Sequence, residues 1–157
     1  MGYETISIEK QGQVDHLWLD RPEVLNAINT QMVTELRDYF AGLAENKDTR
    51  IVVFRGRGRA FCAGLDIKAA VSANDPAPFG GGMGFQGYLA EVYVSMRRCP
   101  QPIISLVQGP ACGGGFAFML ASDIRIAADS ARMNAAFIRI GLSSCDMGTS
   151  YFLPRLV

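Results

Sequence analysis

The hydrophobic and polar positions near the N-terminus alternate with a period of two. Apolar and polar residues alternate from Ile6 to Ile8, and the apolar-rich segment VDHLWLD follows after Gly12. A turn residue between two such segments is typical of a β-hairpin. We therefore predict two antiparallel strands joined by a turn at residues 11–13.

The pattern changes to a helical one in the segment TQMVTELRDYFAGLAENK. Apolar residues recur there three or four positions apart, at Met32, Leu36, Phe40 and Leu43. This spacing places them on one face of a helix. A second helix is predicted around residues 89–99, and a third in the apolar run after Gly115.

Short apolar runs separate the predicted helices. They occupy residues 51–54, 103–107 and 124–127, and their composition favours strands of the buried kind. Buried strands that alternate with helices pair in parallel through right-handed crossovers. The fold class predicted is therefore α/β, in a single domain over residues 1–157.

Three further segments have less regular patterns. Residues 73–88 contain two prolines and five glycines and are predicted to form a loop, because regular patterns resume on both sides. Residues 131–142 favour one more strand, and GTSYFLPRL, from Gly148, favours the start of a helix.

The charge balance disfavours several classes of partner. The chain has 15 basic and 15 acidic residues, so electrostatics predicts neither a nucleic acid nor an anionic membrane as partner. Three arginines, Arg55, Arg57 and Arg59, flank one loop. They suit either a phosphate-bearing small molecule or a solvated loop.

The cysteines and the chain termini indicate a soluble protein of a reducing compartment, and we expect it to be cytoplasmic. Four cysteines lie far apart without a C-x-x-C pair, and a single histidine makes a zinc site hard to assemble. The polar N-terminus lacks the layout of a secretory signal. No apolar run approaches the roughly 18 residues of a membrane span.

Two glycine-rich loops carry the candidate chemistry. FRGRGRAFCAGLD and VQGPACGGGFAFM each follow a predicted buried strand. In a parallel sheet such loops emerge at one edge, where ligands bind. Bare backbone N–H groups from both loops could form an oxyanion hole, and the helix N-terminus after Gly115 would add partial positive charge. From the spacing alone, close packing of a buried helix is the favoured explanation of the glycines.

Neither loop is a common nucleotide motif. The dinucleotide fingerprint G-x-G-x-x-G would need glycine at position 61, which is Phe61, and the chain contains no G-x-x-x-x-G-K-[ST] sequence.

Several segments together resemble the enoyl-CoA hydratase/isomerase, or crotonase, superfamily. These are RPEVLNAIN, GRGRAFCAGLDIK, PIISLVQGPACGGGFAFMLASDIRIA and GTSYFLPRLV, in the same order as in that family. The paired signature A-F-x-A-G-x-D, then G-G-G about fifty residues later before a helix, is specific. The resemblance implies a ββα spiral core that binds acyl-CoA thioesters.

The resemblance also implies roles for individual residues. The two oxyanion-hole amides map to Leu65 and Gly114, with Gly113 beside them. Gly113 and five further residues are expected to contact coenzyme A: Val24, Leu25, Ala63, Asp66 and Ile67. A thioester carbonyl gains charge only as it enolises, so fixed donors favour the transition state.

The chain departs from the family at the two glutamates that hydratases use to add water. Ala117 and Phe137 stand at those positions, and neither side chain can transfer a proton, so hydration is disfavoured. Allowing one inserted residue, Asp146 resembles an aspartate of the isomerase and dehalogenase branches and could relay a proton or attack carbon. Asp146 also suits the N-cap of the following helix.

Other polar residues are expected to be structural. His16 lies in an early strand, Cys62 and Cys112 lack a histidine partner, and Asp123 and Arg125 suggest a pair at a strand start. Ser143, Ser144 and Cys145 could hydrogen-bond an acyl group or form a turn.

We therefore expect enolate-stabilising chemistry on a CoA thioester, with isomerase- or lyase-type outcome. Coenzyme A would be part of the substrate, and no metal or redox cofactor is implied. The alternative is a non-catalytic acyl-CoA binder. Family members usually continue into helices that cap the site and form trimers, and this sequence ends at Val157. We expect the C-terminal helical region to be missing and the chain to assemble into a homotrimer or hexamer.

Overall fold

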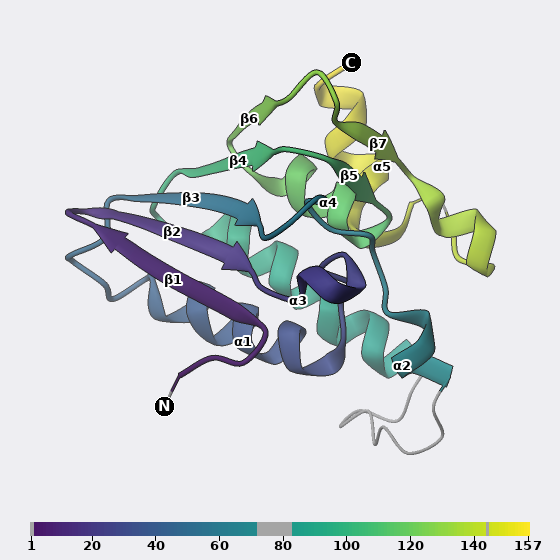
Figure 1. Ribbon diagram of the computed structural model, residues 1–157, viewed down its shortest axis with the longest axis horizontal. Helices are drawn as coiled ribbons and strands as arrows, with labels where there is room; N and C mark the ends of the chain where they lie inside the picture. Colours follow the sequence, from purple (N-terminus) through teal and green to yellow (C-terminus); the bar gives the residue numbers. More distant parts are fainter. Residues whose placement is uncertain (1, 72–82, 144) are drawn as a thin grey trace.

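A five-stranded mixed sheet forms the body of the protein (Figure 1). The computed structural model describes residues 2–71, 83–143 and 145–157. The strands lie in the order β1-β2-β3-β4-β6. Their bounds are β1 Ile6–Gln11, β2 Val14–Leu19, β3 Ile51–Gly56, β4 Ile103–Val107 and β6 Ile124–Ala127.

The hairpin and the parallel strands are as the sequence predicts. β1 and β2 are antiparallel, with Gln11 opposite Val14 across the turn. β2, β3, β4 and β6 are all parallel to their neighbours. The predicted full burial of the strands is wrong: no residue of β6 is buried, and in β3 buried residues such as Phe54 alternate with partly exposed ones such as Val53. The second face of this strand is therefore only partly covered.

Three helices pack on the buried face of the sheet. They are α1 Thr30–Gly42, α3 Met83–Arg98 and α4 Gly114–Ala121, and Figure 1 shows α1 and α3 running beneath the strands. Asn29 caps α1, its side chain accepting a hydrogen bond from the Met32 N–H at 2.9 Å. All eight residues of α4 are buried. Apolar side chains from these helices and the sheet form a common core.

Helix α3 begins earlier than the sequence predicts. It starts at Met83, so residues 83–88 are helical where a loop is expected. The remainder of that expected loop, residues 73–82, lies outside the described residues. A short helix, α2, covers Ile67–Val71.

The C-terminal third contains short elements. β5 Pro110–Cys112 and β7 Arg132–Asn134 pair in parallel as a separate two-stranded sheet. The strand predicted over residues 131–142 is thus wrong beyond Asn134, because residues 136–140 form the 3-10 helix η2. The remaining elements are the 3-10 helix η3 Asp146–Gly148, the predicted helix α5 Thr149–Phe152, and the 3-10 helix η4 Leu153–Arg155.

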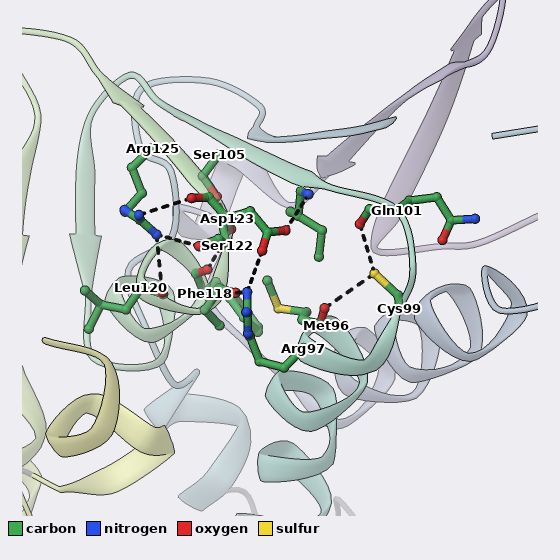
Figure 2. Close-up of polar contacts among 12 residues, drawn as sticks. Met96, Arg97, Cys99, Gln101, Ser105, Phe118, Leu120, Ser122, Asp123 and Arg125 are labelled. Carbon is green, nitrogen blue, oxygen red and sulfur yellow. Dashed lines mark hydrogen bonds and ion pairs between the residues drawn. The ribbon is translucent and has the colours of Figure 1, made fainter. Parts of the chain in front are cut away.

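A polar network fixes the C-terminal end of α4 (Figure 2). The Asp123 carboxylate accepts from Arg97 at 2.7 Å and from the Ile103 N–H at 2.9 Å. The Ser105 and Ser122 hydroxyls are 2.6 Å apart. Asp123 and Arg125 are paired through the main chain, since Arg125 donates to backbone carbonyls, including that of Asp123 at 3.2 Å. The network ties α4 to α3 and to the sheet.

No helix in the described part of the chain is long and apolar enough to cross a membrane.

Candidate functional site

The two glycine-rich loops are joined to each other by backbone hydrogen bonds. The Cys62 N–H donates to the Pro110 carbonyl at 3.1 Å, and the Cys112 N–H donates back to the Cys62 carbonyl at 2.9 Å. These bonds form an isolated parallel bridge between Cys62 and Ala111. The bridge sets the two loops in register, as the sequence argument from parallel strand ends requires.

Each loop then turns through a glycine with positive φ. Gly64 has φ +92° and Gly113 has φ +50°, and side chains rarely adopt either conformation. A Cβ on Gly64 would lie 2.8 Å from the Cys112 carbonyl oxygen. The loops are therefore in direct backbone contact at this point, where a side chain would separate them.

The N–H groups of Leu65 and Gly114 follow directly after these turns. Ile28 bonds to both neighbours of Leu65: its N–H donates to Gly64 at 2.8 Å, and its carbonyl accepts from Asp66 at 2.9 Å. This pattern leaves the N–H of Leu65 directed away from Ile28. Gly114 is the first residue of α4, where N–H groups have no intrahelical acceptor.

A cavity of about 170 Å³ lies where the loops meet. Its lining combines both loops with residues from α2, α3, η2 and η3. The lining residues are Ala63, Gly64, Leu65, Ile67, Gln86, Leu89, Gly113, Gly114, Ala136, Phe137, Arg139, Ile140, Leu142, Asp146 and Met147. Six of the predicted site residues are thus brought together: Ala63, Leu65, Ile67, Gly113, Gly114 and Asp146.

Three predicted residues do not line this cavity. Val24 is 37% exposed in the 3-10 helix η1 Pro22–Val24, and the Leu25 carbonyl accepts from the Ala63 N–H at 3.0 Å. The Asp66 carboxylate pairs with Arg21 at 3.0 Å and accepts from the Ala69 N–H at 3.1 Å. Their expected contacts with coenzyme A stay predictions.

Asp146 contributes a carboxylate to the cavity. Its Oδ2 atom is buried and, among the residues the structure describes, has no hydrogen-bond partner. Burial raises the pKa of this carboxyl group above its ordinary value, and the Met147 N–H opposes the rise. The N-cap prediction is wrong: Gly148 precedes α5, and no side chain caps that helix.

The two positions without glutamate differ in their surroundings. Phe137 lies in η2 and lines the cavity, where its ring approaches Gly113. Ala117 is fully buried inside α4 and does not line the cavity. No carboxylate other than Asp146 lines this cavity among the described residues.

Tyr93, on α3, holds the first turn of α4 in place beside the cavity. This fully buried side chain donates from its hydroxyl to the Gly114 carbonyl at 3.0 Å and stacks on Phe118, with ring centroids 4.9 Å apart. Burial raises its pKa well above the ordinary value, so the group stays a neutral donor. Sequence reasoning missed this residue, because an aromatic residue on the apolar face of a predicted helix usually belongs to the hydrophobic core.

Asn26 is a second residue that sequence reasoning missed. Its amide nitrogen lies 2.9 Å from the Arg57 carbonyl, 3.0 Å from that of Ala60 and 3.2 Å from that of Phe61. Its oxygen accepts from the Arg21 N–H at 2.9 Å. The residue is fully buried and therefore fastens the segment that carries Ile28 to the first glycine-rich loop. The sequence feature that could have indicated this role is the polar residue inside the RPEVLNA motif.

The cysteines and the serine turn lie outside the cavity. Cys62 donates from its thiol to the Asn26 carbonyl at 3.1 Å, and burial raises its pKa to about 12. Ser143 and Cys145 form an exposed turn closed by a hydrogen bond from the Asp146 N–H to the Ser143 carbonyl, at 3.1 Å. Ser144 lies outside the described residues. Cys112 is half-buried beside the bridge.

The loop arginines are engaged elsewhere. Arg55 and Arg57 stack on Trp18 at 4.2 and 4.0 Å from its ring centroid, and Arg57 also pairs with Glu9. Arg59 is exposed and does not line the cavity. His16 lies on β2, 3.3 Å from Gln11, away from the glycine-rich loops.

With this geometry in view, comparison with known proteins decides the family. A sequence model described as Enoyl-CoA hydratase/isomerase matches residues 9–157. The chain belongs to the enoyl-CoA hydratase/isomerase family. The crotonase resemblance and the α/β fold class predicted from the sequence are thereby confirmed.

Individual members of the family are similar over most of the chain. Probable enoyl-CoA hydratase echA12 of Mycobacterium bovis is 35% identical over 152 residues, 92% of this chain and 52% of the relative. The 1,2-epoxyphenylacetyl-CoA isomerase of Escherichia coli is 36% identical over 89% of this chain and 53% of its own. The crystal structure of an enoyl-CoA hydratase from Bacillus anthracis aligns with a TM-score of 0.87 at 29% identity, covering 98% of this chain and 58% of that one.

The chain spans about half the length of the relatives it matches.

Proposed function

We propose that this protein acts on acyl-CoA thioesters through an enolate held by the N–H groups of Leu65 and Gly114. The observation that carries the proposal is the cavity itself. It combines residues of two bridged glycine-rich loops with a single carboxylate, Asp146, whose Oδ2 is buried without a partner among the described residues. Family membership supports a thioester as the ligand.

The proposed chemistry is the movement of a proton between two carbons of the acyl group. The Asp146 carboxylate removes a proton from carbon, and the C–H electron pair moves toward the thioester carbonyl, whose oxygen becomes negative. Two preset N–H donors stabilise that oxygen as its charge develops. Asp146 then returns the proton to a second carbon, so no atom is gained or lost. Coenzyme A stays part of the substrate, and the scheme uses no metal or redox cofactor.

Isomerisation fits this site better than hydration. Adding water across a double bond with paired glutamates needs two proton-transferring groups, and Ala117 and Phe137 supply neither. Two relatives support the choice by name: the 1,2-epoxyphenylacetyl-CoA isomerase of Escherichia coli and a Delta(3,5)-Delta(2,4)-dienoyl-CoA isomerase of Rattus norvegicus, 30% identical to this chain. A homotrimer or hexamer remains our expectation for the assembly.

A turnover screen tests the proposal. Crotonyl-, dienoyl-, β-hydroxyacyl- and aryl-CoA esters are incubated with the protein, and the products and the dissociation constants are measured side by side. Asp146→Asn is expected to lower kcat on the accepted ester by about 10²- to 10⁴-fold, the usual contribution of a general base, with nearly unchanged binding. Asp129→Asn is the matched control, because Asp129 is an exposed aspartate in the turn between β6 and β7 and does not line the cavity.

The alternative is a non-catalytic acyl-CoA binder, favoured by the missing glutamates. Tight binding of an ester without turnover of any would establish it. Full activity of Asp146→Asn would remove the aspartate from the mechanism.

A further inference from the structure

Gln86 is a polar residue of the cavity with no assigned role. It lies on α3, in the segment where the sequence predicts a loop, and its side chain is half-buried. Its Oε1 atom is buried and, within the described ranges, accepts no hydrogen bond. The residue lines the cavity together with Asp146 and the amide-bearing residues Leu65 and Gly114.

The surroundings of Gln86 are otherwise mostly apolar. Leu89, Phe137, Ile140, Leu142 and Met147 form much of the remaining wall. Buried polar atoms in native proteins almost always have a partner, and an unpaired one is costly. Gln86 and Asp146, which carry two such atoms, Oε1 and Oδ2, line the same small cavity. The geometry is that of a site whose ligand brings the missing polar groups.

The chemistry of the two side chains separates their tasks. A carboxylate can take up and return a proton, which is the task proposed for Asp146. A carboxamide does not titrate in the neutral range, but it offers both a donor and an acceptor. Gln86 can therefore hold an oxygen function of a ligand without taking part in proton transfer.

We infer that Gln86 is a specificity-determining residue whose Oε1 accepts a hydrogen bond from a hydroxyl group on the acyl chain. This inference rests on the proposed function, because it places the acyl group of a CoA thioester in the cavity. The preferred substrate is then a thioester whose acyl group carries a hydroxyl group. The group is compact, because the cavity holds about 170 Å³, and a protein cavity of about 150 Å³ accommodates benzene.

Matched pairs of ligands test this inference. Dissociation constants are measured by calorimetry for butyryl-, 3-hydroxybutyryl- and 4-hydroxybutyryl-CoA. The wild-type protein is expected to bind at least one hydroxylated ester about tenfold more tightly than butyryl-CoA. Gln86→Met, which keeps the length of the side chain, is expected to reduce that ratio to about twofold or less, mainly by weakening the binding of the hydroxylated ester.

Two further variants serve as controls for the effect of Gln86→Met. Gln86→Asn keeps the amide on a shorter stem and is expected to retain part of the preference. Gln13→Met replaces an exposed glutamine in the β1–β2 turn and is expected to change nothing. Urea unfolding of each variant confirms that the fold is intact.

The ratio of two affinities distinguishes the outcomes. Equal binding of butyryl-CoA and both hydroxylated esters by the wild type would overturn the inference, and so would a preference that survives Gln86→Met. Failure of the proposed function has a different signature, because the wild-type protein would then turn over none of the esters, whatever their relative affinities.

Discussion

Replacing Asn26 by alanine is expected to destabilise the protein and weaken the candidate site together. The substitution removes an amide that bonds backbone carbonyls of the first glycine-rich loop, and an oxygen that accepts from Arg21. These bonds join the first glycine-rich loop to the segment that positions Ile28, whose backbone bonds flank Leu65. Loss of the amide therefore frees one side of the proposed oxyanion hole.

The size of the effect follows from the contacts. Two amide hydrogens and one oxygen make about three hydrogen bonds, each contributing about 1 kcal/mol net in a buried setting. Asn26 also has φ +56°, a conformation that costs a residue such as alanine about 1 kcal/mol more. The expected loss is about 4 kcal/mol of unfolding free energy, a large share of the roughly 5–15 kcal/mol that holds a typical domain together.

Urea unfolding followed by circular dichroism measures this loss, and titration with a CoA ester measures the effect on the site. Asn134→Ala is the matched control, because that side chain is exposed, and its change should stay within about 0.5 kcal/mol. A loss below about 1 kcal/mol for Asn26→Ala would refute the reasoning. Unchanged ester affinity in a destabilised variant would separate Asn26 from the site.

Three other substitutions have expected outcomes. Burial raises the pKa of Glu35, but hydrogen bonds from Thr5, Gln31 and the Glu4 N–H outweigh burial and hold the pKa below its usual value. The ionised Glu35 carboxylate therefore stabilises the fold at pH values above its unfolded-state pKa, and this stability is lost as the pH falls. Glu35→Gln should make the unfolding free energy, measured across the acid range, less dependent on pH. Burial raises the pKa of Asp146, so ionisation of this carboxyl group costs stability. The unfolding free energy of Asp146→Asn should therefore increase relative to that of the wild type as the pH rises above the ordinary carboxyl pKa. Parallel curves of unfolding free energy against pH would contradict this sign. A Cβ on Gly115 would lie 2.4 Å from the Cys62 carbonyl oxygen, so Gly115→Ala should cost about 1–3 kcal/mol of unfolding free energy and lower the thermal midpoint. Gly87→Ala, with open space around the added Cβ, should leave the midpoint unchanged or raise it.

The sheet and the loop pair could be predicted from the sequence because their signals are local. Alternation around Gly12 marks the hairpin, and short apolar runs mark the parallel strands. The two loops follow strand ends, and that position alone brings them to one edge. Family resemblance then placed Leu65 and Gly114, which the structure finds lining the same cavity.

Other features depend on contacts that a local pattern does not contain. Glycines before residue 88 disfavour a helix, yet α3 extends back to Met83, since packing of its apolar stripe, Leu89, Val92 and Met96, can outweigh weak propensity. The strand predicted after Asn134 stops because its partner β5 is only three residues long. The task of Asn26 depends on carbonyls more than thirty positions away.

The candidate site divides its parts between main chain and side chains, and this bears on how such a scaffold changes over time. An amide N–H at Leu65 or Gly114 survives every point mutation except one to proline. Gln86 and Asp146, by contrast, can each be replaced in a single step. Proteins built on these bridged loops can therefore keep the main-chain donors for a carbonyl oxygen while the side chains beside those donors are substituted. Divergent reactions on a constant scaffold are the expected result.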